Sequence, residues 1–162
     1  MKIRISILIL VCALLLCSCG RTAYDEVSVG MTYDEFESFM DGKDVFAYGR
    51  YAFWRDENGD EFVVEFSGKE FKVNRMRSFS RQGVKPTSED FENIIAGMGI
   101  FEVVERVGIP FRSVTSGFTT FDFLADDGTV YRINFDASNG YGNDMCTFGS
   151  EEYIVLEVNM VE

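Results

Sequence analysis

The feature that most constrains the fold of this chain is an internal repeat. Residues 27–40, VSVGMTYDEFESFM, resemble residues 94–107, IIAGMGIFEVVERV, when the glycine of each Gly-Met pair is aligned. At that offset of 67 residues six positions carry matching side chains: Tyr24 and Phe91, Val27 and Ile94, Gly30 and Gly97, Met31 and Met98, Glu35 and Glu102, Met40 and Val107. Six matches at one offset indicate a duplicated structural unit.

The second copy predicts a helix-turn-helix. Thr87 can cap a first helix, with Asp90 at the third helical position and an apolar face of Phe91, Ile94 and Ile95. Gly97 is expected to end this helix in the left-handed conformation. A second helix would start at Gly99, with Glu102 beside the positive end of its dipole. Its apolar stripe would consist of Ile100, Val103, Val104 and Val107.

The first copy predicts the same second helix through a capping box, in which Thr32 and Glu35 satisfy each other's backbone donors. We expect Met31 and Met98, the methionines after the aligned glycines, to fill the corner between the helices. The apolar residues that follow the capping box are Phe36, Phe39 and Met40.

Alternating apolar residues follow each helix pair, and here the offset becomes 69 residues because Gly59 matches Gly128. The Asn-Gly and Asp-Gly pairs at these glycines are typical of tight hairpins. Partner strands are expected over 51–55 and 70–79 and, in the second copy, over 118–124 and 153–160. One face of each central strand would be buried against the helices: Phe62, Val64 and Phe66, matched by Tyr131, Ile133 and Phe135.

The expected fold is therefore α+β, with two tandem copies of a helix-turn-helix followed by about three antiparallel strands. We expect the two sheets to join into one curved sheet. The first repeat would span residues 24–79, a polar linker residues 80–86 and the second repeat residues 87–162. The glycine-rich segment 137–151 has no counterpart in the first repeat.

The N-terminus has the pattern of a signal peptide over residues 1–18. Lys2 and Arg4 precede an apolar run that ends at Leu16. This run is shorter than the ~20 apolar residues of a membrane span, and an uncleaved anchor is the alternative.

The end of that run, LCSC at residues 16–19, resembles the bacterial lipobox. The resemblance implies that Cys19 is the lipidated N-terminus and that residues 19–23 form a tether. Cys17 fits the pattern less well, because bulky Leu16 precedes it where a small side chain is expected. The chain would then be extracytoplasmic and lipid-anchored to a bacterial cell membrane, either the cytoplasmic or the outer one.

Cleavage would leave 144 residues and move the formal charge from −12 to −14. Such a charge disfavours binding to nucleic acid or to anionic lipid headgroups. It is typical of a soluble surface, and a docking field for a basic partner is the second interpretation. Cys146 would be the one cysteine of the folded part, so no internal disulfide is expected, and without any histidine it lacks the usual activating base.

The repeated segments VSVGMTYDEFESFM and IIAGMGIFEVVERVGIP look like the opening motif of the β-lactamase-inhibitor-protein-like fold, which small SmpA/OmlA-type envelope lipoproteins share. The resemblance covers both copies, most of residues 24–162. It implies a tandem-repeat lipoprotein whose joined sheets form a concave face for another protein, with an acidic side chain on a hairpin of the first copy. With no disulfide expected and a lipid anchor expected at Cys19, the chain would differ from the inhibitor in both respects.

Enzyme chemistry is poorly supported. The chain has no histidine, no nucleophile-elbow pattern and no phosphate-binding glycine loop. The segment DENGDE, residues 56–61, superficially resembles a calcium loop, but Ser67 stands where an EF-hand needs its bidentate glutamate. We therefore expect no enzymatic activity, no metal and no cofactor.

Two groups of residues are candidates for binding a partner protein. Tyr51 and Phe53 would point away from the helices and form an aromatic recognition patch, unless a one-residue slip or the second copy makes them core. The acidic hairpin tip of Asp56, Glu57 and Asp60 is the second candidate, with an ordinary solvated turn as its alternative. The expected function is a membrane-tethered protein-binding module, the alternative is a structural assembly factor of the cell envelope, and an exported enzyme is third.

Overall fold

The computed structural model describes residues 26–81, 83–114, 119–136 and 153–161. The described part has an α+β fold, as predicted, with three short helices and two antiparallel four-stranded sheets. No helix in these ranges is long and apolar enough to cross a membrane. The expected signal peptide, the Cys19 tether, Cys146 and the glycine-rich segment 137–151 all lie outside the described residues.

Both sheets have strands in sequential order, and each contains one strand more than the three expected. The additional strand is the first of each sheet, which pairs with the outer side of the predicted hairpin. The first sheet consists of β1 (Val45–Tyr48), β2 (Tyr51–Arg55), β3 (Glu61–Ser67) and β4 (Lys72–Phe79). The second consists of β5 (Arg112–Ser113), β6 (Thr119–Leu124), β7 (Val130–Asp136) and β8 (Ile154–Val161).

The helices begin where the sequence predicts. Helix α3 (Tyr33–Met40) starts after Thr32, whose backbone N–H donates to the Glu35 carboxylate over 2.9 Å. Helix α4 (Ser88–Glu92) starts after Thr87, which is held in the same way by Asp90, and helix α5 (Ile100–Val107) follows Gly99.

The end of α4 was predicted wrongly. The helix ends at Glu92, well before Gly97, and Ile95 is 63% exposed instead of buried. Gly97 does adopt a positive φ of 92°, but its backbone N–H donates to Val155 of β8 over 2.8 Å. The glycine therefore attaches the turn between the helices to the edge of the second sheet.

The two halves make equivalent backbone hydrogen bonds between the turn before the longer helix and the last strand of each sheet, β4 or β8. Gly30 N donates to Val73 O, and Gly97 N to Val155 O, each over 2.8 Å. A register shift interrupts the pairing of β3 with β4 and of β7 with β8 at corresponding residues. A helix before α3 would lie around residue 24, before the described range begins, so the helix pair of the first copy stays a prediction.

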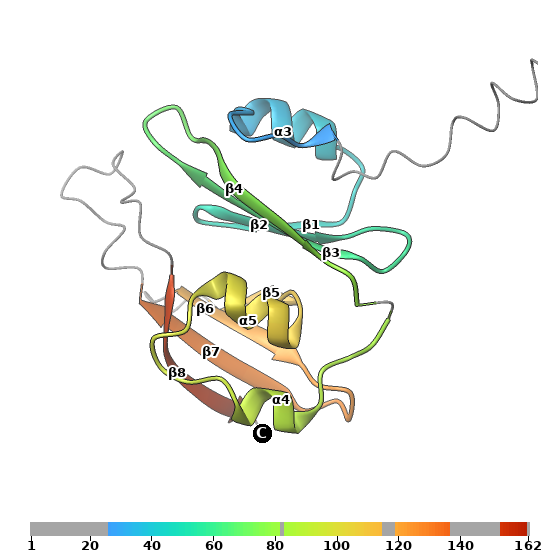
Figure 1. Cartoon of the computed structure of the whole chain (residues 1–162), viewed down its shortest axis with the longest axis vertical. Coiled ribbons are helices and arrows are strands. Elements are labelled where there is room, and N and C mark those ends of the chain that lie inside the picture. The colour runs from blue at the N-terminus through green and yellow to red at the C-terminus, as the bar shows by residue number, and fades with distance from the viewer. Residues whose placement is uncertain (1–25, 82, 115–118, 137–152, 162) are drawn as a thin grey trace, which may run out of the picture.

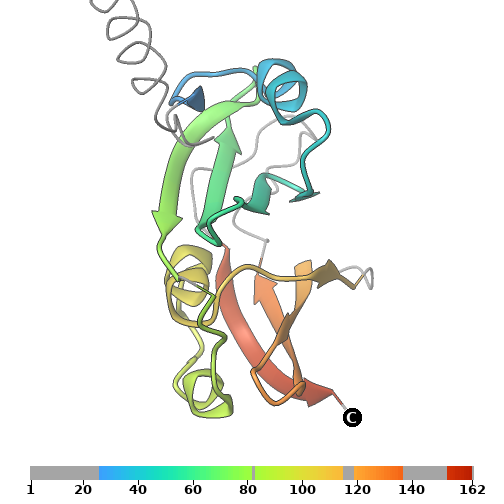
Figure 2. The ribbon, with the colours of Figure 1, turned by 90° about the vertical axis from the view of Figure 1, so that its right-hand side faces the viewer.

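The elements stack face to face (Figures 1 and 2), with α3 on one face of the first sheet and α5 on its opposite face, next to the second sheet. The described strands form two separate sheets, so the joined sheet expected from the resemblance is not observed. The strand residues predicted to face α3 do so. Together with Phe36 and Met40 of the helix, Trp54, Phe62, Val64 and Phe66 form a core. A second core fills the space between the first sheet, α5 and the inner face of the second sheet.

The centre of the outer face of the second sheet is polar where the matching part of the first sheet is apolar. At the 69-residue offset, Thr120 and Asp122 replace the first sheet's Tyr51 and Phe53. Asp122 is buried in ion pairs with Arg112 and Arg132. Burial by itself would raise the pKa of the Asp122 carboxyl, but hydrogen bonds from Arg132 and Arg112 and their charges hold this pKa below its ordinary value.

The exposed side of α3 is polar as well. Asp34 and Glu37 stand at the positions of Phe101 and Val104 in α5, which are buried against the first sheet's core. Repeat proteins end in units with polar outer faces because an apolar end would recruit further copies. The polar side of α3 and the polar centre of the second sheet's outer face therefore disfavour further stacking. The flank between the sheets presents both charged and apolar side chains.

Candidate binding site

The two aromatic residues proposed as a recognition patch are not on the surface. Tyr51 and Phe53 are both 0% exposed. The Phe53 ring lies 5.7 Å from that of Phe121, and the Tyr51 ring 6.1 Å from that of Phe101. The predicted exposed patch is therefore wrong, and the alternative is correct: the second half covers this face of the first sheet.

The acidic hairpin tip lies at the surface, but its three carboxylates differ. Asp56 accepts hydrogen bonds from the backbone N–H groups of Asn58 and Asp60, both over 2.9 Å, so this carboxylate shapes the turn. Glu57 is exposed and Asp60 is half-buried. The tip is thus a rigid acidic turn, and its contact with a partner stays a prediction.

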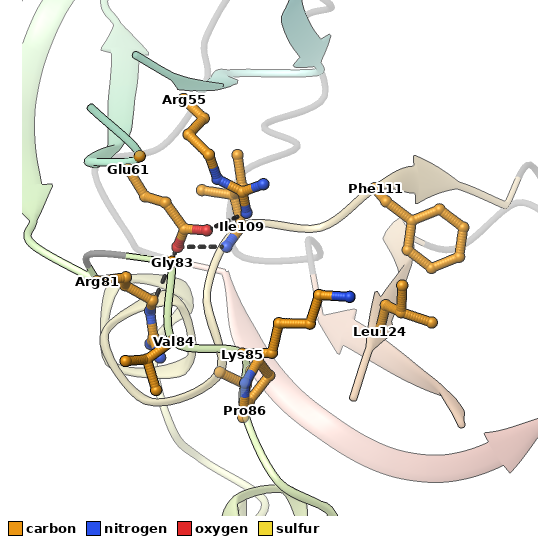
Figure 3. A pocket seen from close by; sticks show the side chains of 12 residues that line it. Arg55, Glu61, Arg81, Gly83, Val84, Lys85, Pro86, Ile109, Phe111 and Leu124 are labelled. Carbon is orange, nitrogen blue, oxygen red and sulfur yellow. Dashed lines mark hydrogen bonds and ion pairs between the residues drawn. The ribbon is translucent and has the colours of Figure 1, made fainter. Parts of the chain in front are cut away.

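A cleft of about 370 Å³ opens beside this hairpin, on the flank where the two halves meet (Figure 3). The hairpin and the linker are close together here, since a Cβ on Gly59 would lie 3.6 Å from the backbone nitrogen of Gly83. The described lining comes from the first hairpin, the linker, the loop after α5 and β6: Arg55, Gly59, Glu61, Arg81, Gly83, Val84, Lys85, Pro86, Val107, Ile109, Phe111 and Leu124.

Glu61 organises the inner wall of the cleft. Its side chain is only 2% exposed and pairs with Arg55 and, over 3.3 Å, with Arg81. The same carboxylate accepts a hydrogen bond from the backbone N–H of Ile109 over 3.1 Å. Gly108 fits tightly against it, because a Cβ there would lie 2.9 Å from a Glu61 oxygen. Glu61 thus joins the first sheet, the linker and the loop after α5.

Arg81 connects the linker to the end of α5. Its terminal nitrogen donates to the backbone oxygens of Val104, over 2.8 Å, and of Glu105. A cation at this position also interacts favourably with the negative end of the helix dipole. The guanidinium is therefore fixed on several sides, and its charge stays at the wall of the cleft.

The rest of the lining combines a positive charge with exposed apolar surface. Lys85 is exposed and forms no ion pair with another residue of the described ranges. Figure 3 shows its side chain extending toward Phe111 and Leu124. Val84, Phe111 and Leu124 are 69%, 48% and 41% exposed. Three large apolar side chains at the mouth of one recess form a surface suited to a partner.

The described lining of the cleft consists of cations, apolar side chains, two glycines and one carboxylate. Its one described carboxylate is occupied by ion pairs, and no hydroxyl or thiol nucleophile is among the described lining residues. Within the part of the chain that the structure describes, no group of three or more acidic, histidine or cysteine side chains is placed to hold a metal ion.

The sequence did not point to this cleft. Its residues come from four separated segments, and Val84 and Lys85 belong to a stretch that reads only as a polar linker. The 69-residue offset does pair Arg55 with Leu124, but it gives no sign that both line one recess.

Comparison with known proteins finds no relative of the chain. No family model matches it, and neither a curated protein nor a solved structure matches it. What the site binds must therefore be inferred from its geometry and chemistry.

Proposed function

We propose that this chain is a lipid-tethered protein-binding module of the bacterial cell envelope, and that it binds its partner along the flank between the two sheets. The observation that carries the proposal is the cleft itself. A chain of net charge −12 gathers three cations and three exposed apolar side chains around this recess. Arginine and aromatic residues are enriched in protein interfaces.

The architecture supports the flank as the binding surface. We infer that a helix-turn-helix and strand unit was duplicated, and that the copies stack face to face. The exposed side of α3 and the centre of the outer face of the second sheet are polar, and the apolar face of the first sheet is covered, so the cleft is the best-placed surface for an apolar contact. The hairpin tip of Asp56, Glu57 and Asp60 borders it and would contact the same partner. Exposed charges of this kind mainly change the association rate.

Site-specific crosslinking in the native envelope tests this proposal. A photoreactive amino acid in place of Leu124 should give a discrete crosslinked protein, because that side chain lies at the mouth of the cleft. The same amino acid in place of Ile95, which is 63% exposed and does not line the cleft, is the matched control. Products would be identified by mass spectrometry.

The pattern of products decides between the functions. A specific product from position 124 and none from position 95 supports a binding cleft; equal products from both positions, or none from either, would contradict it. A large membrane complex as the product favours the assembly-factor alternative, and a soluble or secreted protein favours capture.

The tether is tested separately through the cysteines of the lipobox-like segment. Cys19→Ala should leave an unprocessed precursor, because the residue proposed to receive the lipid is missing. Cys17→Ala, the control, should be processed and lipidated normally. Incorporation of a labelled fatty acid and the size of the mature protein are the measurements. A Cys19→Ala chain that still takes up the label would overturn the assignment.

A further inference from the structure

We propose that the cleft binds a short acidic peptide segment of the partner, in which a carboxylate side chain stands next to large apolar residues. This inference rests on the proposed function and specifies the chemistry of the partner. It follows from three observations: the local excess of positive charge, the exposed apolar side chains beside it and the limited size of the recess.

The charge of the described lining is positive although the chain is strongly acidic. The described lining carries three cations, Arg55, Arg81 and Lys85, and one carboxylate, Glu61. One of the cations is enough to balance the charge of Glu61. Glu61 is fully engaged: one oxygen pairs with Arg55, and the other contacts Arg81 and the backbone N–H of Ile109. Lys85 and the exposed guanidinium of Arg55 are left with donors for an incoming anion.

The apolar part of the cleft lies next to these cations. Figure 3 shows the Lys85 side chain reaching toward Phe111 and Leu124. Covering such side chains contributes about 25 cal/mol per Å² of apolar area. The volume of about 370 Å³ is at the small end of ligand sites, which span roughly 300–1,000 Å³. The recess thus has room for a few side chains and not for a folded element.

The overall charge of the chain selects for a short segment with few charges. A polyanion such as nucleic acid would extend beyond the cleft over a surface of net charge −12 and be repelled. At physiological ionic strength the Debye length is about 8 Å, so a carboxylate in the cleft interacts mainly with nearby charges. The cations of the lining attract it, and the acidic hairpin tip at the border disfavours additional negative charge on the segment.

Two matched peptides test this inference on the full-length chain. One is an acetylated, amidated pentapeptide with glutamate followed by leucine and phenylalanine between alanines. The other has glutamine in place of glutamate. In 150 mM salt, fluorescence anisotropy should show at least ~10-fold tighter binding of the glutamate peptide, as expected for a charge-assisted hydrogen bond.

Two variants of the same charge connect this preference to the cleft. Lys85→Gln should reduce the preference for glutamate at least ~3-fold. Lys69→Gln removes an equal charge from the exposed turn at the other end of β3 and should leave the preference unchanged. Both residues are exposed, so neither substitution is expected to disturb folding.

Several results would overturn the inference: no binding of the glutamate peptide, equal binding of both peptides, or equal effects of the two lysine substitutions. Displacement of the peptide by octanoate at lower concentration than by unlabelled peptide would assign the cleft to a lipid carboxylate. Self-association that is lost in Lys85→Gln would assign it to a second copy. If crosslinking from position 124 succeeds while the peptides do not bind, the inferred peptide specificity is rejected and the proposed function is kept. If crosslinking fails while the glutamate peptide binds selectively, the proposed function is rejected and the peptide specificity of the cleft is kept.

Discussion

Replacing Phe53 by alanine should lower the free energy of unfolding by about 3–5 kcal/mol, the range found for large-to-small substitutions at buried aromatic positions. The ring is fully buried, and its centroid lies 5.8 Å from the ring of Phe46 and 5.7 Å from that of Phe121. Its removal would leave a cavity between the two sheets. Because this core is shared, we expect both halves to lose stability together in one transition.

Phe111→Ala is the matched control, since it removes the same atoms from a ring that is 48% exposed. This variant should change stability little and weaken binding at the cleft. Denaturant unfolding, followed by tryptophan fluorescence and by far-ultraviolet circular dichroism, measures both variants. Trp54 reports on the first sheet, whereas circular dichroism reports on both halves. A Phe53→Ala chain of unchanged stability would show that the ring is not core.

The local structure could be read from the sequence because it depends on neighbours along the chain. Alternation in Phe62, Val64 and Phe66 identified a strand face that does pack on a helix. Thr32 and Thr87 marked helix starts through side chains three residues away. Both of these patterns lie within a few residues, so they need no knowledge of the tertiary fold.

What covers each face of a sheet could not be predicted from such local patterns. The period of two residues places Tyr51 and Phe53 on the side opposite α3, but it does not say whether solvent or protein covers that side. The contact of Phe53 with Phe121 joins residues that are far apart in the chain. Only the stacking of the two halves makes this face a core.

The cleft was unpredictable for a related reason. Glutamate is almost never fully buried unless it is paired, and Glu61 reads from the sequence as the end of an acidic turn. Its burial depends on Arg81 from the linker and on the loop at Ile109, which the fold brings to it. Buried charges of this kind are decided by tertiary contacts, and local patterns do not reveal them.

Glu61→Ala should lower the free energy of unfolding by about 3 kcal/mol, because removing one partner of a buried ion pair leaves the other charge without compensation. The variant loses the contacts to Arg55 and Arg81 and the acceptor for the Ile109 N–H. Arg81 is mostly buried, so water can replace little of what it loses. Glu61→Gln keeps an oxygen that can accept the hydrogen bond from the Ile109 N–H. Its free energy of unfolding should therefore lie between those of Glu61→Ala and the original chain. Denaturant unfolding measures both.

A double-mutant cycle with Arg81 separates the ion pair from the packing of the glutamate side chain. Arg81→Ala and Glu61→Ala should have a combined effect smaller than the sum of the single effects, with a coupling energy of about 1–3 kcal/mol, as for residues in contact within one polar network. Arg55→Ala should couple less to Glu61→Ala, since Arg55 is exposed and water takes its place. Strictly additive effects of the Glu61 and Arg81 variants would mean that the carboxylate does not hold the linker, and the cleft would then need another support.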